Sequence, residues 1–213
     1  MPDYKQQIQR DWSSAPYYEL AEKNLRPFWS IGPPFVRMFE TLDPANVVEL
    51  ACGHGRHAAH IRDNHPFGHI TLVDVNEANI EVCRDRFAGD DRFSFLTNSG
   101  SDLLSLPSGA YTSLFCYDAM VHFEYDDVFE YLKEFYRILC ANGRALLHHS
   151  NYDQNPGARY SDNPGWRNFM SATLFAHAAM RSGFLVLEQQ LIDWAGVPRL
   201  DCATLLVKPG TSS

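Results

Sequence analysis

Short runs rich in β-branched and aromatic residues alternate with longer amphipathic segments in the central part of this chain. The β-rich runs span residues 46–52, 69–75, 92–96, 112–117 and 144–150. Amphipathic segments at 56–64, 77–87 and 126–139 have apolar residues at helical spacing. This alternation is typical of a parallel sheet with helices on both faces. The sequence therefore predicts an α/β fold with a doubly wound, mostly parallel sheet.

Two further β-rich runs follow a predicted helix at 173–181 and span residues 184–194 and 200–208. Gly196-Val197-Pro198 connects these two runs. So short a connection predicts an antiparallel hairpin.

Helix 126–139 is expected to end at a cap formed by Asn142 and Gly143, because these residue types adopt the left-handed conformation that closes a helix.

The first 44 residues differ from the rest of the chain. We expect helical segments there, with breaks at Pro16, Pro27 and Pro33-Pro34. Their aromatic residues include Trp12, Tyr17, Tyr18, Phe28 and Trp29. We therefore expect a helical cap or lid over residues 1–44 and one main domain over residues 45–213.

Composition narrows the class of function. A net charge of -8 does not supply the basic face that nucleic acids or anionic lipids require, so we expect a small-molecule partner. The five cysteines are scattered singly, which predicts reduced thiols. The polar N-terminus and the lack of a long apolar run predict neither signal peptide nor membrane span. A cytoplasmic monomer or homodimer is expected.

A glycine turn follows the first predicted strand, in the sequence Glu49-Leu-Ala-Cys-Gly53-His-Gly55. Glycines at a strand-to-helix turn let the backbone approach a cofactor, and the start of the helix presents unpaired N–H groups. Asp74 ends the next strand, where a carboxylate can accept hydrogen bonds from both ribose hydroxyls. Asp74 could also cap the following helix.

These motifs, followed by Asn98 and by Cys116-Tyr117-Asp118, resemble those of class I S-adenosylmethionine-dependent methyltransferases. The resemblance covers roughly residues 45–208 and implies a seven-stranded sheet with a terminal antiparallel hairpin. The implied cofactor is S-adenosyl-L-methionine. Its implied contacts are Glu49, Ala51, Gly53 and Gly55 at the methionine moiety, Asp74 with Val75 beside it at the ribose, Asn98, Gly100 and Ser101 at the adenine, and Tyr117 and Asp118 closing the pocket. Ala51 stands where the family often has glycine.

Three histidines are candidates for a catalytic base, which a hydroxyl acceptor would need. His148 and His149 end the fifth strand, and neighbouring strand residues point to opposite faces, so one of them should face the site. His122 follows the fourth strand. We expect no metal site, since His54, His57 and His60 lack a carboxylate partner.

The polar stretch after the fifth strand holds the candidate acceptor-binding residues. Aromatic rings there could stack on a sugar or an aromatic ring, and arginines could pair with a carboxylate or phosphate. These candidates are Tyr152, Arg159, Tyr160, Trp166 and Arg167. The same stretch could also be a solvated connector.

The favoured function is methyl transfer to a hydroxyl, in preference to an amine, of a polar and conceivably sugar-bearing small molecule. Two alternatives stay open. One is a nicotinamide-dependent reductase, which the glycine pattern allows, although the chain lacks an evident Tyr-x-x-x-Lys pair. The other is a non-catalytic module that keeps the fold and binds cofactor without turnover.

Overall fold

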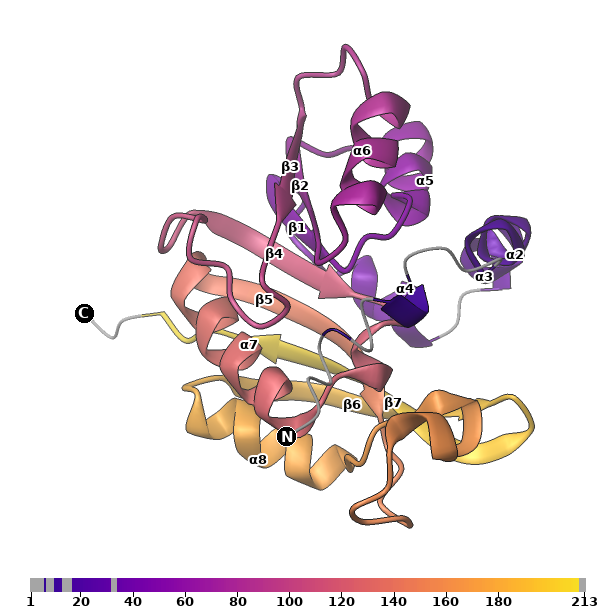
Figure 1. Ribbon diagram of the computed structural model, residues 1–213. Coiled ribbons are helices and arrows are strands. Elements are labelled where there is room, and N and C mark those ends of the chain that lie inside the picture. Colours follow the sequence, from indigo (N-terminus) through magenta and orange to yellow (C-terminus); the bar gives the residue numbers. More distant parts are fainter. Residues whose placement is uncertain (1–5, 7–9, 13–16, 32–33, 211–213) are drawn as a thin grey trace.

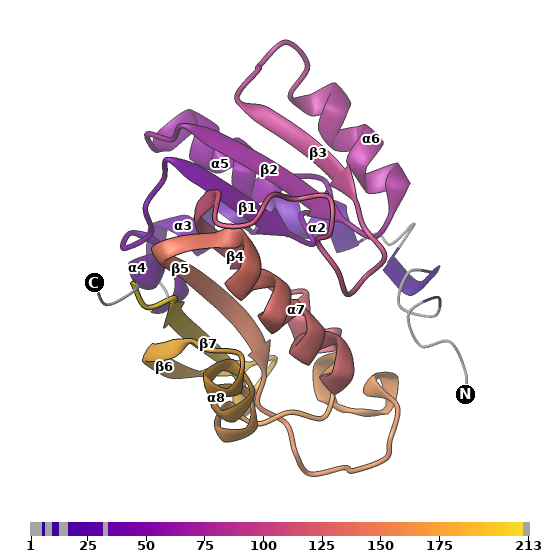
Figure 2. The same ribbon diagram turned by 90° about the vertical axis from the view of Figure 1, so that its left-hand side faces the viewer.

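The computed structural model describes residues 6, 10–12, 17–31 and 34–210, and a seven-stranded sheet forms its centre (Figures 1 and 2). The strand order is β3-β2-β1-β4-β5-β7-β6. The strands are β1 (Asn46–Leu50), β2 (His69–Asp74), β3 (Phe93–Thr97), β4 (Tyr111–Cys116), β5 (Leu139–Ser150), β6 (Leu185–Trp194) and β7 (Val197–Val207). Strands β1 to β5 pair in parallel, whereas β7 runs antiparallel to both β5 and β6. The predicted α/β architecture with its C-terminal hairpin is thus confirmed.

Helices cover both faces of the sheet. They are α2 (Tyr17–Lys23), α3 (Leu25–Ile31), α4 (Pro34–Phe39), α5 (Arg56–Asn64), α6 (Glu77–Arg86), α7 (Tyr125–Ile138) and α8 (Ala172–Arg181). Apolar residues of α4, α5 and α6 form one core layer, and those of α7 and α8 form the other (Figure 1). Three short 3₁₀ turns, Met120–His122, Tyr160–Asp162 and Pro164–Trp166, lie in the connections.

The end of α7 differs from the sequence prediction. The helix ends at Ile138, and Asn142 lies instead inside β5, with a φ of 64° beside an irregularity in the β4–β5 register. Lys208 Nζ donates to the carbonyl oxygens of Tyr136 and Leu139, at 2.7 Å each. A distant lysine, and not a local glycine cap, therefore satisfies carbonyl groups at the end of this helix.

The hairpin turn is also tighter than expected. Trp194 pairs with Val197, so Ala195 and Gly196 alone form the turn, with φ values of 49° and 79°. Two consecutive positive φ values match the two-residue turns whose twist suits paired strands. Val197 and Pro198, predicted to be part of the connection, belong to β7.

The helices α3 and α4 pack against the core layer that contains α5. Pro27 was expected to break a helix but lies in the first turn of α3, where its missing N–H costs no hydrogen bond. The interruption falls at Asn24 instead. Pro34 begins α4, and the expected breaks at Pro16 and Pro33 lie outside the described residues. Within the described ranges, no helix has the length and apolar character needed to cross a membrane.

Candidate functional site

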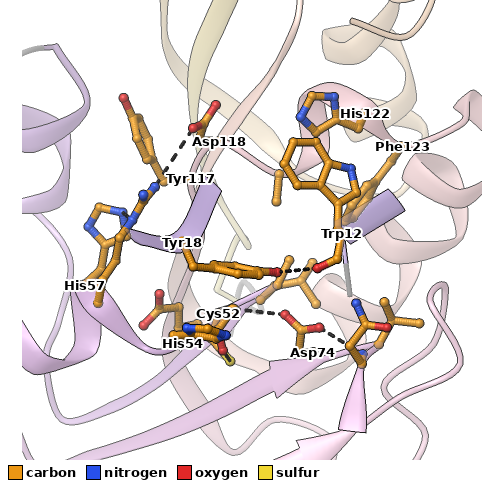
Figure 3. A pocket seen from close by; sticks show the side chains of 18 of the residues that line it. Trp12, Tyr18, Cys52, His54, His57, Asp74, Tyr117, Asp118, His122 and Phe123 are labelled. Carbon is orange, nitrogen blue, oxygen red and sulfur yellow. Dashed lines mark hydrogen bonds and ion pairs between the residues drawn. The ribbon is translucent and has the colours of Figure 1, made fainter. Parts of the chain in front are cut away.

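A cavity opens where β1, β2 and β4 end, at the carboxyl edge of the parallel strands (Figure 3). It encloses about 1080 Å³ of empty space, including solvent at its mouth. Side chains from α2, α5 and α7 line it together with the ends of these three strands.

The glycine turn after β1 forms one wall. Ala51, Gly53 and Gly55 all have positive φ values, of 54°, 54° and 70°. Gly53 lies against α2, since a Cβ added there would come within 2.6 Å of the Tyr18 ring. Ala51 and Gly53 line the cavity, but Gly55 does not. A Cβ on Gly55 would come within 2.8 Å of Phe87, so this glycine permits close packing of the turn on α6.

Asp74, at the end of β2, holds this turn in place. Its Oδ2 accepts a hydrogen bond from Gly53 N at 2.9 Å, and its Oδ1 accepts from Asn76 N at 2.9 Å. Asn79 Nδ2 donates to the same Oδ1 at 3.1 Å. Asp74 and Val75 both line the cavity. Val75 contributes a further backbone hydrogen bond, so protein donors surround this carboxylate and a ligand hydroxyl would share its oxygens with them.

Glu49 has a buried polar atom without a partner, a feature that it shares with Trp12 Nε1 among the described lining residues. The Glu49 side chain is buried and has a backbone hydrogen bond from Ala58, but Oε2 has no hydrogen-bond partner within the described part of the chain. Burial raises the pKa of Glu49 to about 8, against the opposing effect of Arg56. A buried carboxyl group without a partner is costly unless a ligand supplies a donor.

The loop after β3 contributes the far end of the cavity. Asn98 and Gly100 line it, whereas Ser101 does not. The Asn98 amide donates to Asp102 O at 2.9 Å and to Tyr131 Oη at 2.8 Å. These bonds fix the loop against α7, because Tyr131 is buried in that helix.

Tyr117 and Asp118 follow β4 and line the opposite wall. The Tyr17 hydroxyl donates to Asp118 Oδ2, and Arg56 forms an ion pair with the same oxygen at 3.9 Å. Arg56 Nη2 also donates to Tyr17 Oη at 3.2 Å. The first residues of α2 and α5 and the residue that follows Tyr117 therefore meet at one point of the wall.

His122 lines the cavity. Its ring lies against that of Trp12, with ring centroids 4.8 Å apart, and Figure 3 shows the two side chains next to each other. His122 Nδ1 is 2.6 Å from Trp166 O. A carbonyl oxygen can only accept, so Nδ1 carries the proton and Nε2 has the lone pair. Burial lowers the pKa of His122 to about 4.

His148 and His149 lie away from the cavity. Both rings are fully buried, and each has contacts for both of its nitrogens. His149 stacks on Phe175 of α8, with centroids 3.7 Å apart, and burial lowers the pKa of His149 to about 3. His148 stacks instead on Tyr117 at the wall of the site. The alternation of the two rings between faces agrees with the strand geometry, although neither of them lines the cavity.

The predicted acceptor-binding stretch lies behind the cavity wall. None of Tyr152, Arg159, Tyr160, Trp166 and Arg167 lines the cavity formed by the described residues. Tyr160 and Trp166 pack around His122 and Trp12, at centroid distances of 6.0 and 5.9 Å. Arg167 is buried and forms ion pairs with Asp118 and Asp201. Tyr152 forms an isolated bridge with Phe169.

Sequence reasoning did not identify several residues that line the cavity. Among them are Arg56, Asn76, Phe123 and Tyr131. The position of Arg56, directly after Gly55, was a usable signal, because the first helical residue after a glycine turn lies beside the turn. Phe123 and Tyr131 looked like ordinary core residues, and only the packing of α7 brings them to the cavity.

The wall suits the cofactor that the sequence predicts. The unpartnered Glu49 carboxyl faces a cavity whose other walls hold Gly53 and Asp74, and Asn98 lies at the far end. An ammonium group would supply the donor that Glu49 lacks, and ribose hydroxyls could bond to Asp74. S-adenosylmethionine offers both kinds of group.

Residues 47–143 match the family model of a methyltransferase domain. No curated protein matches the chain in sequence. Geranyl diphosphate C-methyltransferase from Streptomyces coelicolor A3(2), solved with Mg²⁺, geranyl diphosphate and S-adenosyl-L-homocysteine, has a similar structure, with a TM-score of 0.72 and 13% identity. The superposition covers 97% of this chain and 98% of that chain.

Two further structures have the same fold. An S-adenosylmethionine-dependent methyltransferase from Mesorhizobium loti has a TM-score of 0.66 and 15% identity, covering 82% of this chain and 96% of that one. A chain of the complex between the Haloferax volcanii Trm112 methyltransferase activator and a methyltransferase has a TM-score of 0.70 and 18% identity. It covers 96% of this chain and 99% of that one.

Proposed function

We propose that the chain is an S-adenosylmethionine-dependent methyltransferase with the class I fold, which methylates a hydroxyl group of a polar small molecule with His122 as the base. The observation that carries this proposal is the orientation of His122 in the cavity. Its Nδ1 proton is engaged by the Trp166 carbonyl oxygen, so the Nε2 lone pair is the one able to accept a proton.

The cofactor would be held by Glu49, Gly53, Asp74 and Asn98. When bound, S-adenosylmethionine supplies an electrophilic methyl group on a sulfonium centre. The ring of His122 is neutral over the ordinary pH range because burial lowers its pKa to about 4. A neutral ring can accept the proton that a hydroxyl group loses as its oxygen becomes a nucleophile.

The lid would position the acceptor and exclude water. Trp12 packs against His122, and Tyr18 stacks on His54 with ring centroids 4.0 Å apart. Both aromatic side chains line the cavity. Tyr160 and Trp166, the sequence candidates for acceptor binding, would act from behind by supporting Trp12 and His122. A dry, closed site places the reacting groups in line and removes competing water.

An amine is the second candidate for the methyl acceptor, because the cavity lining has more acidic than basic side chains. Five carboxyl side chains line the cavity, and Arg56 is the only Lys or Arg among the described lining residues. The carboxyl groups belong to Glu22, Glu49, Asp74, Asp118 and Asp127. This excess of acidic groups favours a cationic or neutral acceptor over an anionic one.

Two measurements test the proposal. Calorimetric titration with S-adenosylhomocysteine, NADH and NADPH should show binding of the first alone, and binding of a nicotinamide cofactor instead would overturn it. Transfer of a labelled methyl group is then measured over a panel of paired small molecules that differ only in a hydroxyl or an amino group. Transfer to hydroxyls supports the proposal, and transfer to amines alone supports the second candidate. Tight binding without any transfer would indicate a non-catalytic module.

A further inference from the structure

Asp118 has a backbone conformation that its surroundings must maintain. Its φ is 56°, in the left-handed region that residues with a Cβ rarely adopt. Such conformations persist where neighbouring groups over-determine them, and they are frequent at functional sites. Asp118 lines the cavity, and its carboxylate meets Arg56 and Tyr17 there.

The group that holds the Asp118 backbone is His148. Asp118 N donates to His148 Nδ1 at 3.1 Å, and His148 Nε2 lies 3.0 Å from Asp201 Oδ2. A backbone N–H can only donate, so Nδ1 is the acceptor and the ring proton lies on Nε2, which donates to Asp201. The ring is also stacked on Tyr117, at a centroid distance of 4.8 Å.

Asp201 is itself fixed by Arg167. Arg167 Nε donates to Oδ1 at 2.8 Å and Nη2 donates to Oδ2 at 2.6 Å, a two-pronged contact. Although burial opposes ionisation, the hydrogen bonds from Arg167 and His148 hold the pKa of Asp201 at about 2. Arg167 Nη2 is also 3.7 Å from Asp118 Oδ1, which closes a ring of four residues.

This ring links the end of β4 to β5, β7 and the segment after β5. Its members are Asp118, His148, Asp201 and Arg167. The side chains of His148 and Asp201 are fully buried, and Arg167 and Asp118 are 3% and 10% exposed. Charged groups at this depth are costly unless they are paired, so removing one member of the ring leaves its partners buried and unsatisfied.

We propose that His148 is a positioning residue of the methyltransferase site, which sets Asp118 through its Nδ1 lone pair while Asp201 and Arg167 fix the ring tautomer. The carboxylate of Asp118 is thereby held where it meets Arg56 and the lid residue Tyr17. The role of His148 differs from that of a base, because both of its nitrogens are engaged in hydrogen bonds and neither is available to a methyl acceptor. This inference rests on the proposed function for its catalytic readout.

His149 is a natural control, because it neighbours His148 and is equally buried. Its Nδ1 is 2.8 Å from Ser150 O, so Nδ1 donates, and its Nε2 is 2.8 Å from Thr204 Oγ1. The two adjacent histidines should therefore be opposite tautomers. Only His148 bonds to a residue that lines the cavity.

The first test is the tautomer, read by ¹⁵N–¹H correlation spectra of histidine-labelled protein, with signals assigned by substitution of each histidine. We expect His148 to carry its proton on Nε2, and His149 and His122 to carry theirs on Nδ1. A proton on Nδ1 of His148 would overturn the proposal, because Asp118 N–H would then have no acceptor. This measurement requires neither cofactor nor acceptor.

The second test uses two substitutions that keep different halves of the ring. In His148→Asn the amide reaches about as far as Nδ1 and can accept from Asp118. In His148→Gln the amide reaches the position of Nε2 and keeps the contact with Asp201. We expect His148→Gln to lower kcat by about ten- to a hundredfold relative to the wild type, which is the scale for a displaced site group. The His148→Asn variant, which keeps the acceptor for Asp118 N–H, should have a kcat much closer to that of the wild type.

His149→Asn and His149→Gln are the matched controls. They should lower the melting temperature as much as the His148 variants do and leave kcat within about twofold, well below the effect of a displaced site group. Equal losses of kcat at both positions would show that His148 is merely structural and would overturn the proposal. Failure of the proposed function can be told apart from failure of this inference. In the first case the wild type would transfer no methyl group, while the histidine tautomers would still be those expected.

Discussion

Gly53 and Asp74 are joined by a hydrogen bond of 2.9 Å, from the backbone nitrogen of the glycine to Oδ2 of the acid. The carboxylate at the end of β2 thus holds the glycine turn at the end of β1. The same side chain lines the cavity, where a ribose hydroxyl would share its oxygens with the protein donors. One residue therefore organises the turn and faces the place where a ribose would bind.

Asp74→Ala should weaken binding of S-adenosylhomocysteine. Loss of two charge-assisted hydrogen bonds corresponds to about 1.4–2.8 kcal/mol, or roughly ten- to a hundredfold in Kd. Calorimetric titration measures the change, and Asp74→Asn, which keeps the shape and one carbonyl oxygen, should lose less. An unchanged Kd in a folded Asp74→Ala variant would contradict the ribose assignment.

Glu49 should make cofactor binding dependent on pH. Because the pKa of Glu49 is about 8 in the folded protein, its carboxyl group keeps a proton that the unfolded chain releases near pH 4.5. The contribution of Glu49 to the free energy of unfolding therefore falls progressively as pH rises from 4.5 to 8. A bound ammonium group favours the ionised carboxylate, so binding releases the proton. The affinity for S-adenosylhomocysteine should rise between pH 6 and 7.5, by at most about tenfold per pH unit. Glu49→Gln should abolish this slope, and a slope that persists would rule out Glu49 as its origin.

His122 should determine the acidic limb of the pH–rate profile. Because burial lowers its pKa to about 4, kcat/KM for the acceptor, measured with saturating S-adenosylmethionine, should hold down to about pH 5 instead of falling near the ordinary histidine value of about 6.5. His122→Asn should lower kcat by roughly 10²–10⁴, the contribution of a general base. Binding of S-adenosylhomocysteine serves as the control and should persist. A variant with full turnover would exclude His122 as the base.

Gly55→Ala should destabilise the fold more than Gly89→Ala does. Both glycines have positive φ, 70° and 82°, so each alanine costs about 1–2 kcal/mol of backbone strain. A Cβ on Gly89 meets nothing within 4 Å, whereas one on Gly55 comes within 2.8 Å of Phe87 and 3.1 Å of Cys83 Sγ. Overpacking adds about 1–3 kcal/mol at Gly55 alone. Thermal unfolding compares the two variants, and equal melting temperatures would refute the packing role.

Local patterns were enough to predict the architecture and the glycine turn with its acid. The periodicity of apolar residues reports which face of each element is buried, so the strands, α5 and the C-terminal hairpin were predictable within a few residues. Gly53 and Asp74 lie at the ends of adjacent strands, and parallel strands bring those ends to one edge of the sheet.

The tertiary structure alone decided the contacts that join distant parts of the chain. Lys208, and not Asn142, satisfies the end of α7, and His148 is bound by Asp118 and Asp201 instead of facing an acceptor. Sequence spacing identifies strand residues but not which long-range partner fills each hydrogen bond, because that depends on how separate elements pack. The sequence by itself therefore determined the fold and the place of the site, whereas packing decided which histidine could act as a base.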